Sequence, residues 1–293
     1  MPSLIQKSIS SSKNPTLSVP DLGISAAAKD QLKLEAGAKE LESLDSVIPS
    51  AAESAGRGEV CARSRSRFGE ELSVIRLLGW QMKRDGIYVE MGALDGVTYS
   101  STLALQTCLG WTGLLIEGSP RHFQRLYQNY KDVENVIVQY GAVCAPPLTN
   151  ATFSQGMNVG SVDGDVTYLP VGLRKRFSYR RQRVVVPCRP MEWYLQKLPK
   201  KHVDFMSLDV EGAELEVLLT MDFAEVLVEV FLIELHDWGR SEQTQSWKIR
   251  KLMGNLGYKD QQLGREGEDS LMIRSWATDF DDILQRYALI CLK

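Results

Sequence analysis

The sequence predicts an α/β fold with a mostly parallel sheet covered by helices on both faces. From about residue 68 onward, short apolar runs alternate with helix-like segments, which is the pattern of βαβ units. Several apolar runs end in a glycine or a carboxylate, where parallel sheets bind ligands. The composition is that of a globular protein, with 44% apolar and 24% charged residues among 293. One large domain can hold most of the chain.

The first half of the alternating pattern lies between residues 70 and 140. Apolar spacing predicts helices over 70–82, from Ser100 and over 120–130. Between them, apolar runs predict strands over 86–92, 112–117 and 136–140. The connections are expected to be right-handed crossovers, which place the carboxyl ends of the strands at one edge.

The second half begins after an irregular stretch. Residues 145–186 contain a Pro-Pro pair, four glycines and a strand-like valine run, so we interpret this stretch as an insertion. The pattern then predicts helices over 191–198, 213–219 and 246–256 and strands over 203–209 and 231–235. Residues 1–58 are almost free of aromatics and are expected to form a disordered or partly helical leader to a domain of residues 59–293.

Charge and cysteine content exclude several classes of protein. A formal net charge of -3 argues against a dedicated nucleic-acid binder. No apolar run approaches the ~20 residues of a membrane span. Five widely spaced cysteines without a CxxC pair predict neither a disulfide framework nor structural zinc. We expect a cytoplasmic protein; the alternative is organelle import, suggested by the Ser-rich N-terminus.

A glycine-containing turn follows the first predicted strand. Glu90 ends the strand, and Gly92 and Gly96 let the backbone approach a ligand before the next helix. The residues between the glycines, Ala93 to Asp95, do not fit the GxGxxG pattern of dinucleotide binders. An acid here suits a ligand with a cationic amino-acid end and disfavours a pyrophosphate. A turn needed only for packing is the alternative.

The next two strands end in residues that suit a nucleoside. Glu117 stands one βα unit later, where an acid can accept both ribose hydroxyls. Gly141 and Ala142 follow the third strand, where a flat adenine could lie, although a simple turn explains the glycine equally well. Together with the glycine turn, Glu117 favours a ligand site over a solvent-facing acid.

Carboxylates and a histidine follow the later strands. Asp209 and Glu211 end one strand, where a buried acid could orient or deprotonate a hydroxyl. Glu214 is explained as well by the positive end of the next helix. His236 lies two residues after Glu234 and is a second candidate base. Three histidines in the whole chain predict no histidine metal site.

Three stretches carry a family resemblance. These are Tyr-Val-Glu-Met-Gly-Ala-Leu-Asp-Gly-Val-Thr-Tyr-Ser at 88–100, Gly-Trp-Thr-Gly-Leu-Leu-Ile-Glu at 110–117 and Asp-Phe-Met-Ser-Leu-Asp-Val-Glu-Gly-Ala-Glu-Leu-Glu-Val-Leu at 204–218. They resemble the FkbM-type S-adenosylmethionine-dependent methyltransferases, most closely the eukaryotic branch. The resemblance extends with gaps from about residue 68 to residue 258.

The resemblance implies a class I methyltransferase fold, with a Rossmann-like seven-stranded sheet that ends in an antiparallel hairpin. It implies that Glu117 holds the ribose of S-adenosylmethionine and that Asp209 and Glu211 lie beside the transferred methyl. Ser119 stands where relatives commonly have an asparagine before a proline. The residues expected to line the methionine part of the cofactor are Glu90, Gly92, Ala93, Asp95 and Gly96.

The expected reaction is methylation of a hydroxyl on a small molecule, sugar or lipid. Asp209 is the first candidate base. Residues 174–183 hold six basic side chains and no acid, so Arg180 and Arg181 could bind an anionic group on the acceptor. The alternatives are a catalytically silent scaffold with this fold and, disfavoured by the missing GxGxxG, a nicotinamide-dependent oxidoreductase.

Overall fold

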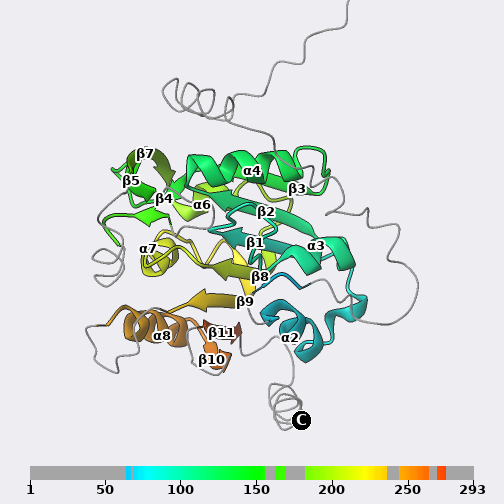
Figure 1. The fold of residues 1–293 in the computed structure, drawn as a ribbon. Helices are drawn as coiled ribbons and strands as arrows, with labels where there is room; N and C mark the ends of the chain where they lie inside the picture. Colours follow the sequence, from blue (N-terminus) through cyan, green and yellow to red (C-terminus); the bar gives the residue numbers. More distant parts are fainter. Residues whose placement is uncertain are drawn as a thin grey trace, which may run out of the picture.

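The computed structural model describes residues 64–66, 69–155, 163–168, 182–235, 244–263 and 269–274. Within these ranges the chain forms a central seven-stranded sheet and a second sheet of four strands (Figure 1). The leader expected over residues 1–58 lies outside the described residues, so the domain boundaries stay a prediction.

The central sheet has the order β10-β11-β9-β8-β1-β2-β3. All its neighbours pair in parallel except β11, which is antiparallel to both β9 and β10. A mostly parallel sheet that ends in an antiparallel hairpin confirms the class I methyltransferase fold. The strands are β1 (Ile87–Met91), β2 (Thr112–Glu117), β3 (Val136–Tyr140), β8 (His202–Leu208), β9 (Leu227–Glu234), β10 (Tyr258–Leu263) and β11 (Asp269–Arg274).

Helices cover both faces of this sheet because its inner strands are apolar on both sides. Along β1, Tyr88 packs into one core cluster and its neighbours Ile87 and Val89 into the other. The first cluster includes residues of α2 (Glu70–Leu77), α3 (Leu103–Leu109) and α4 (Pro120–Tyr130). The second includes residues of α6 (Met191–Leu195), α7 (Glu214–Leu219) and α8 (Gln245–Asn255).

The helix predicted over 70–82 is divided in two. Gly79 adopts a left-handed φ of 68°, just after α2 ends, and a short 3-10 helix, η2 (Trp80–Met82), follows. By contrast, α4 begins at Pro120 as predicted, since proline fits the first turn of a helix. Periodicity therefore locates the helices, and glycine decides where one of them stops.

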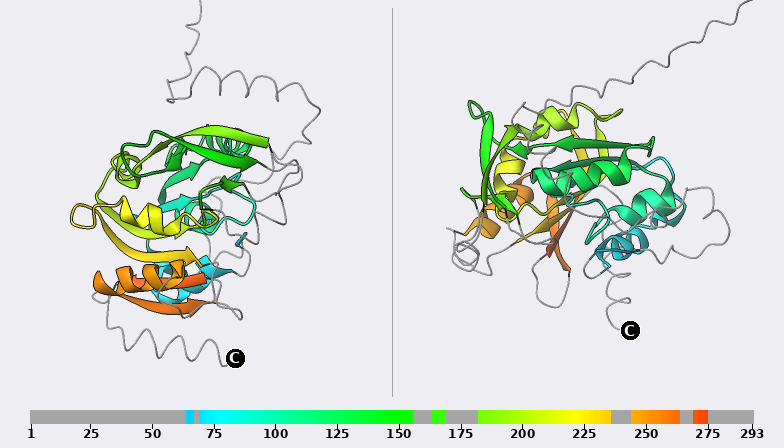
Figure 2. Two further views of the ribbon diagram at one scale, coloured as in Figure 1. Left: turned by 90° about the vertical axis from the view of Figure 1, so that its left-hand side faces the viewer. Right: turned by 45° about the horizontal axis from the view of Figure 1, so that its top comes forward.

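The second sheet coincides in large part with the stretch 145–186 interpreted as an insertion, but it begins earlier, at Ala142, and ends later, at Arg189. Its order is β4-β7-β5-β6, and it lies on the opposite side of the molecule from the C-terminal hairpin (Figures 1 and 2). Its strands are β4 (Ala142–Val143), β5 (Asn150–Gln155), β6 (Gly164–Asp165) and β7 (Gln182–Arg189). Along β7, Val184, Val186 and Cys188 are buried while Val185 and Arg189 are exposed, as expected for a sheet with one covered face.

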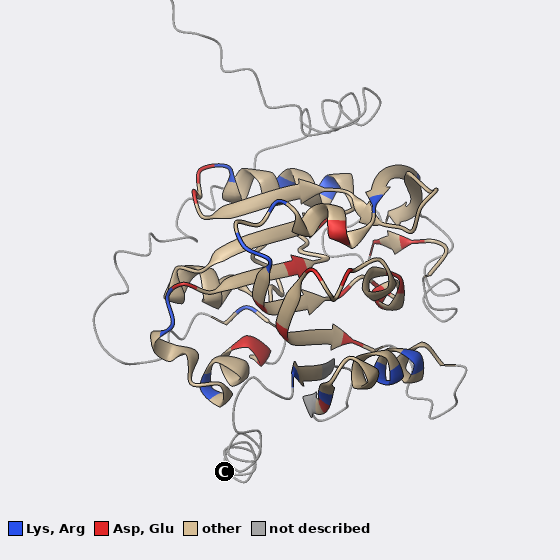
Figure 3. Cartoon of the chain, turned by 180° about the vertical axis from the view of Figure 1, so that it is seen from behind, with Lys and Arg blue, Asp and Glu red and all other residues tan. Residues whose placement is uncertain are grey.

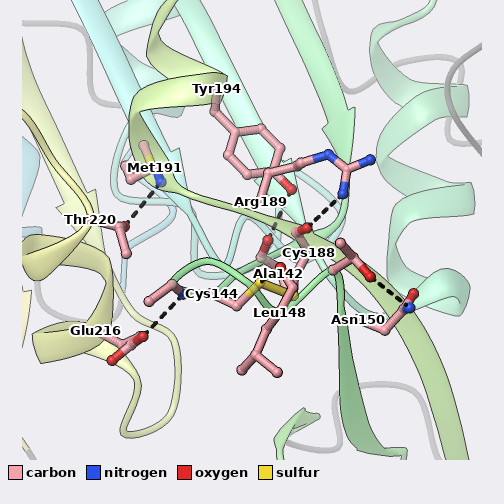
Figure 4. The surroundings of a disulfide bond; sticks show 12 residues. Ala142, Cys144, Leu148, Asn150, Cys188, Arg189, Met191, Tyr194, Glu216 and Thr220 are labelled. Carbon is pink, nitrogen blue, oxygen red and sulfur yellow. Dashed lines mark hydrogen bonds between the residues drawn. A yellow bond between two sulfur atoms is a disulfide. The ribbon is translucent and has the colours of Figure 1, made fainter.

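The cysteines were expected to form no disulfide framework, but the three within the described ranges are all disulfide-bonded. Cys144 and Cys188 form one disulfide, with their Cα atoms 5.6 Å apart and 44 residues apart in sequence (Figure 4). Parallel pairing of Ala142 in β4 with Cys188 in β7 brings the two together. Cys108 is also disulfide-bonded. The spacing of the cysteines in the sequence could not reveal the Cys144–Cys188 disulfide, because that bond depends on β7 pairing with β4.

None of the helices in the described part of the chain has the length and apolarity that crossing a membrane requires.

Candidate active site

A cavity of about 410 Å³ opens at the carboxyl ends of the parallel strands. This is the edge at which open α/β sheets bind ligands, and the volume lies within the range of small-molecule sites. Its lining comes from the turns after β1, β2, β8 and β9, from α4 and from the second sheet. The lining side chains that matter below are Glu70, Glu90, Gly92, Ala93, Glu117, Gly118, His122, Phe153, Asp163, Asp209, Glu211 and Glu234.

Glu90 lies in the wall of the cavity and also holds the start of α3. Its carboxylate accepts hydrogen bonds from the Ser100 hydroxyl (2.8 Å), the Ser101 backbone N–H (2.8 Å) and the Thr102 hydroxyl (2.6 Å). Burial raises the pKa of Glu90 to about 7, although these three hydrogen bonds oppose the shift. Glu90 is therefore close to half-ionised near neutral pH.

Gly92 brings the turn after β1 against the end of β8. Its φ of 87° is left-handed, and a Cβ on it would overlap the backbone oxygen of Asp209. The N–H groups of Gly92 and Ala93 both donate to the Ile116 carbonyl, at 3.0 and 3.1 Å. The turn is thus fixed between β2 and β8, and Gly92 and Ala93 both line the cavity.

Asp95 and Gly96 shape this turn and do not line the cavity. The Asp95 carboxylate accepts from the N–H groups of Val97 and Thr98, at 2.9 and 2.7 Å. The Gly96 carbonyl accepts from the Tyr130 hydroxyl at 2.7 Å. The positions expected to contact the methionine part thus divide into cavity-lining residues and residues that support the loop.

Glu117 lies at the end of β2 with one oxygen facing each of two turns. Oε2 accepts from the Leu94 N–H (2.8 Å) and Oε1 from the Ser119 N–H (2.6 Å). The side chain is buried yet lines the cavity. Burial raises its pKa to about 8, and the negative charge of Asp163 adds to the shift, against the pull of the backbone hydrogen bonds.

Ser119, Gly141 and Ala142 lie outside the cavity lining. The Ser119 hydroxyl donates to Asp163 at 2.8 Å. Gly141 has a φ of 146° and packs against Tyr194, whose hydroxyl donates to the Ala142 carbonyl at 3.0 Å. Gly141 and Ala142 lie where the chain passes from β3 of the central sheet to β4 of the second sheet.

Asp209, Glu211 and Glu234 bring three carboxylates together at the ends of β8 and β9. One carboxylate oxygen from each lies within 4.8 Å of the other two. Asp209 is exposed at the cavity and is not the buried acid that the sequence predicted. Partial desolvation by the surrounding protein and the charges of Glu234 and Glu211 raise its pKa above its usual range. Oxygen ligands at this spacing could also hold a divalent cation.

The neighbouring Glu214 has a structural role. Its Oε1 accepts from the N–H groups of Val210 (3.1 Å) and Gly212 (3.0 Å), which orders the turn before α7. This turn places Glu211 in the cavity with a left-handed φ of 58°. Two other non-glycine residues with positive φ, Leu94 and Tyr99, also line the cavity, so backbone strain gathers at this site.

Sequence reasoning missed three contributors to the cavity. His122 comes from α4, and Phe153 and Asp163 come from the second sheet and the stretch before β6. Asp163 lies 3.7 Å from the His122 ring and 3.3 Å from the Arg121 guanidinium. No motif marks these residues. His122 reaches the cavity from α4, directly after β2, whereas Phe153 and Asp163 are brought to β2 only by the fold of the insertion. His236, Arg180 and Arg181 lie outside the described residues.

The cavity is strongly acidic. Seven of its lining residues are Asp or Glu, and no lysine or arginine lines it within the described ranges. Figure 3 shows basic residues on outer helices, α8 among them, while acidic residues lie at strand ends in the middle of the molecule. Such a cavity attracts a cation and repels an anion.

Comparison with known families identifies the chain. The family model described as "Methyltransferase FkbM domain" matches residues 90–259, which is more than half of the sequence. The chain belongs to the FkbM methyltransferase family. Its match begins at Glu90 and includes the turns after β1, β2, β8 and β9 that form the cavity.

Solved structures similar to this FkbM methyltransferase are distant. The N-terminal domain of human METTL16 in complex with SAH is 12% identical, with a TM-score of 0.39 over 69% of this chain and 66% of that one. A putative O-methyltransferase from Klebsiella pneumoniae is 13% identical, with a TM-score of 0.41 over 86% and 98%. A methyltransferase FkbM from Methylobacillus flagellatus KT is 14% identical, with a TM-score of 0.37 over 65% and 44%.

The FkbM chain thus spans about two thirds of the METTL16 domain and less than half of the Methylobacillus protein. No curated protein matches its sequence. The assignment to the family rests on the match to the FkbM domain, and these distant likenesses add no argument about substrate.

Proposed function

We propose that this FkbM methyltransferase transfers a methyl group from S-adenosylmethionine to a hydroxyl oxygen of a small molecule, sugar or lipid. The observation that carries the proposal is the acidic cavity of about 410 Å³ at the carboxyl ends of the parallel strands. A donor with a sulfonium and an ammonium group is complementary in charge to its seven carboxylates. When bound, the donor supplies an electrophilic methyl group.

The residues at the cavity suit that donor. Glu117, buried at the end of β2, is the group that accepts the ribose hydroxyls, since its oxygens are held in place by two backbone N–H donors. Glu90, Gly92 and Ala93 bind the amino-acid end. Asp209 receives the acceptor's proton, because its carboxylate lines the cavity and because desolvation and the charges of Glu234 and Glu211 raise its pKa and so its basicity.

The charge of the cavity also bears on the acceptor. Seven acidic and no basic side chains from the described residues line the cavity, and even with Glu90 and Glu117 partly protonated an anionic group would be repelled, so we propose that the reacting end of the acceptor is neutral or cationic. Binding of an anionic tail by Arg180 and Arg181 stays a prediction outside the described residues. Positioning of donor and acceptor in line is the main catalytic contribution expected of the protein.

Calorimetric titration with S-adenosylmethionine and, separately, NAD tests the cofactor. We expect micromolar binding of the methyl donor alone, weakened at least about tenfold by Glu117→Ala. The matched control is Glu192→Ala, which removes an exposed carboxylate from α6 and should leave binding unchanged. Binding of NAD instead would favour the oxidoreductase alternative and reject the proposal.

The second arm of this test separates an enzyme from a silent scaffold. Purified protein is screened against hydroxylated acceptors, and Asp209→Asn is then compared with the unmodified chain. We expect turnover to fall by about 10²- to 10⁴-fold while donor binding is retained, because asparagine keeps the shape and cannot take the proton. Unchanged turnover would remove Asp209 from the mechanism, and donor binding without any turnover would favour the scaffold.

A further inference from the structure

The second sheet begins at β4, which follows β3 of the central sheet after Gly141. Two residue pairs join β4 to the returning strand β7, namely Ala142 with Cys188 and Val143 with Arg189. The Cys144–Cys188 disulfide lies directly beside this pairing, where the chain leaves for the second sheet and where it returns (Figure 4). Both cysteines are buried, at 3% and 0% exposed. The disulfide therefore closes the base of the whole insertion.

The far end of the same insertion forms part of the cavity wall. Phe153 of β5, Asp163 and Gly164 all line the cavity. The Phe153 ring packs on Gly118 so closely that a Cβ at that position would overlap it. Asp163 accepts from the Ser119 hydroxyl at 2.8 Å, and the Ser119 N–H in turn donates to Glu117 at 2.6 Å. A continuous set of contacts thus joins the inserted sheet to Glu117.

We propose that the Cys144–Cys188 disulfide is the clamp that holds the inserted sheet against the end of β2, so that tight binding of the methyl donor requires the oxidised protein. Neither cysteine lines the cavity, so the disulfide acts indirectly, by fixing the position of the inserted sheet. Without it, the inserted sheet is held by strand pairing, by the packing of Phe153 in the core and by the contacts of Asp163 with Ser119 and Arg121. Its base at Cys188 is then no longer fixed, and its fit against the end of β2 is less constrained. The part of this proposal that concerns affinity rests on the proposed function.

The clamp forms by thiol–disulfide exchange. A small-molecule disulfide such as oxidised glutathione accepts two electrons from the two cysteine thiolates, the S–S bond forms in the protein, and two molecules of reduced glutathione leave. Structural disulfides form and persist in oxidising compartments. The competent protein is accordingly one that folds in such a compartment, in place of the cytoplasm expected from the sequence.

The test compares the oxidised wild type with Cys144→Ala/Cys188→Ala, because chemical reduction would also break the disulfide of Cys108. Calorimetry gives the affinity for S-adenosylmethionine, and hydrogen exchange follows β5, β7 and residues 117–119 without any ligand. The control is Val186→Ala, which weakens the buried face of β7 and keeps the disulfide. We expect at least tenfold weaker binding and faster exchange at residues 117–119 in the double variant only.

Unchanged affinity together with unchanged exchange at residues 117–119 would overturn the clamp, as would equal losses in Val186→Ala. If the wild type binds no S-adenosylmethionine, the proposed function fails while the exchange data still decide the clamp. Should the double variant not fold, the same two measurements are made on Cys108→Ala protein purified reduced, before and after oxidation by oxidised glutathione, so that the disulfide of Cys108 takes no part. Peptide mapping then has to show the Cys144–Cys188 linkage in the tightly binding form.

Discussion

At the scale of single residues, two buried glutamates of the cavity are held by different kinds of donor. Glu90 accepts from two hydroxyls and one backbone N–H, whereas Glu117 accepts from two backbone N–H groups. A hydroxyl can also accept a hydrogen bond, so a neutral amide can replace Glu90 without an unpaired donor. In Glu117→Gln, by contrast, the amide nitrogen would face a backbone N–H, and two donors would be left opposed.

Glu90→Gln is therefore a clean test of pH-dependent stability. The pKa of Glu90 is about 7 when folded and about 4.5 when unfolded, so between these values the folded protein holds a proton that the unfolded chain has released. Stability then falls as the pH rises through this window. Urea unfolding at pH 5 and pH 8 should show a loss about 3 kcal/mol smaller in Glu90→Gln.

The exposed Glu192→Gln on α6 is the control for that experiment and should leave the pH dependence unchanged. Some loss with rising pH remains in Glu90→Gln, because Glu117 titrates in an overlapping range with a pKa of about 8. Identical pH profiles in wild type and Glu90→Gln would mean that Glu90 is ionised in the folded protein across the whole range.

At the scale of elements, the contact between the turn after β1 and the end of β8 decides the shape of the site. Local periodicity predicted the strand at 112–117, the helix at 120–130 and the strand at 136–140 with the bounds that the structure has. The requirement for glycine at position 92 has a different origin, because it comes from the Asp209 carbonyl more than 100 residues away.

Gly92→Ala and Gly79→Ala together separate backbone strain from steric overlap. Both glycines have a positive φ, 87° and 68°, but a Cβ at Gly79 meets nothing within 4 Å. Gly79→Ala should cost about 1 kcal/mol, from the left-handed conformation alone. Gly92→Ala should cost more than about 3 kcal/mol, because backbone at the end of β8 must move. Urea midpoints measure both, and equal costs would contradict the close approach.

At the scale of the whole molecule, charge is separated in space. The chain has a formal net charge of only -3, yet seven carboxylates line one cavity. Burial raises the pKa of Glu90 to about 7 and that of Glu117 to about 8, so the negative charge of the cavity grows as the pH increases through neutrality. A cationic ligand is then bound more tightly at higher pH.

This charge separation predicts different pH profiles for S-adenosylmethionine and S-adenosylhomocysteine. The two ligands share the nucleoside and the amino-acid end, but only the first has a sulfonium charge. Between pH 6 and pH 8 we expect the ratio of their affinities to shift toward S-adenosylmethionine by about tenfold, equivalent to about 1.4 kcal/mol. Calorimetry at three pH values measures the ratio, and Asp209→Asn should reduce the shift. Parallel profiles would mean that the carboxylates lie too far from the sulfur to matter.

The sequence alone determined the central sheet and its ligand-binding edge. Apolar periodicity is a local property, and it located the helices and the five parallel strands of the central sheet. The C-terminal hairpin was implied by the family resemblance alone. Residues at strand ends pointed to Glu90, Glu117 and Asp209, all of which line the cavity. Only the tertiary structure decided the rest of the site. The second sheet, the disulfide and the places of Phe153 and Asp163 depend on pairing between distant segments. Such pairing depends on which strand the chain returns to, and no local pattern encodes that choice.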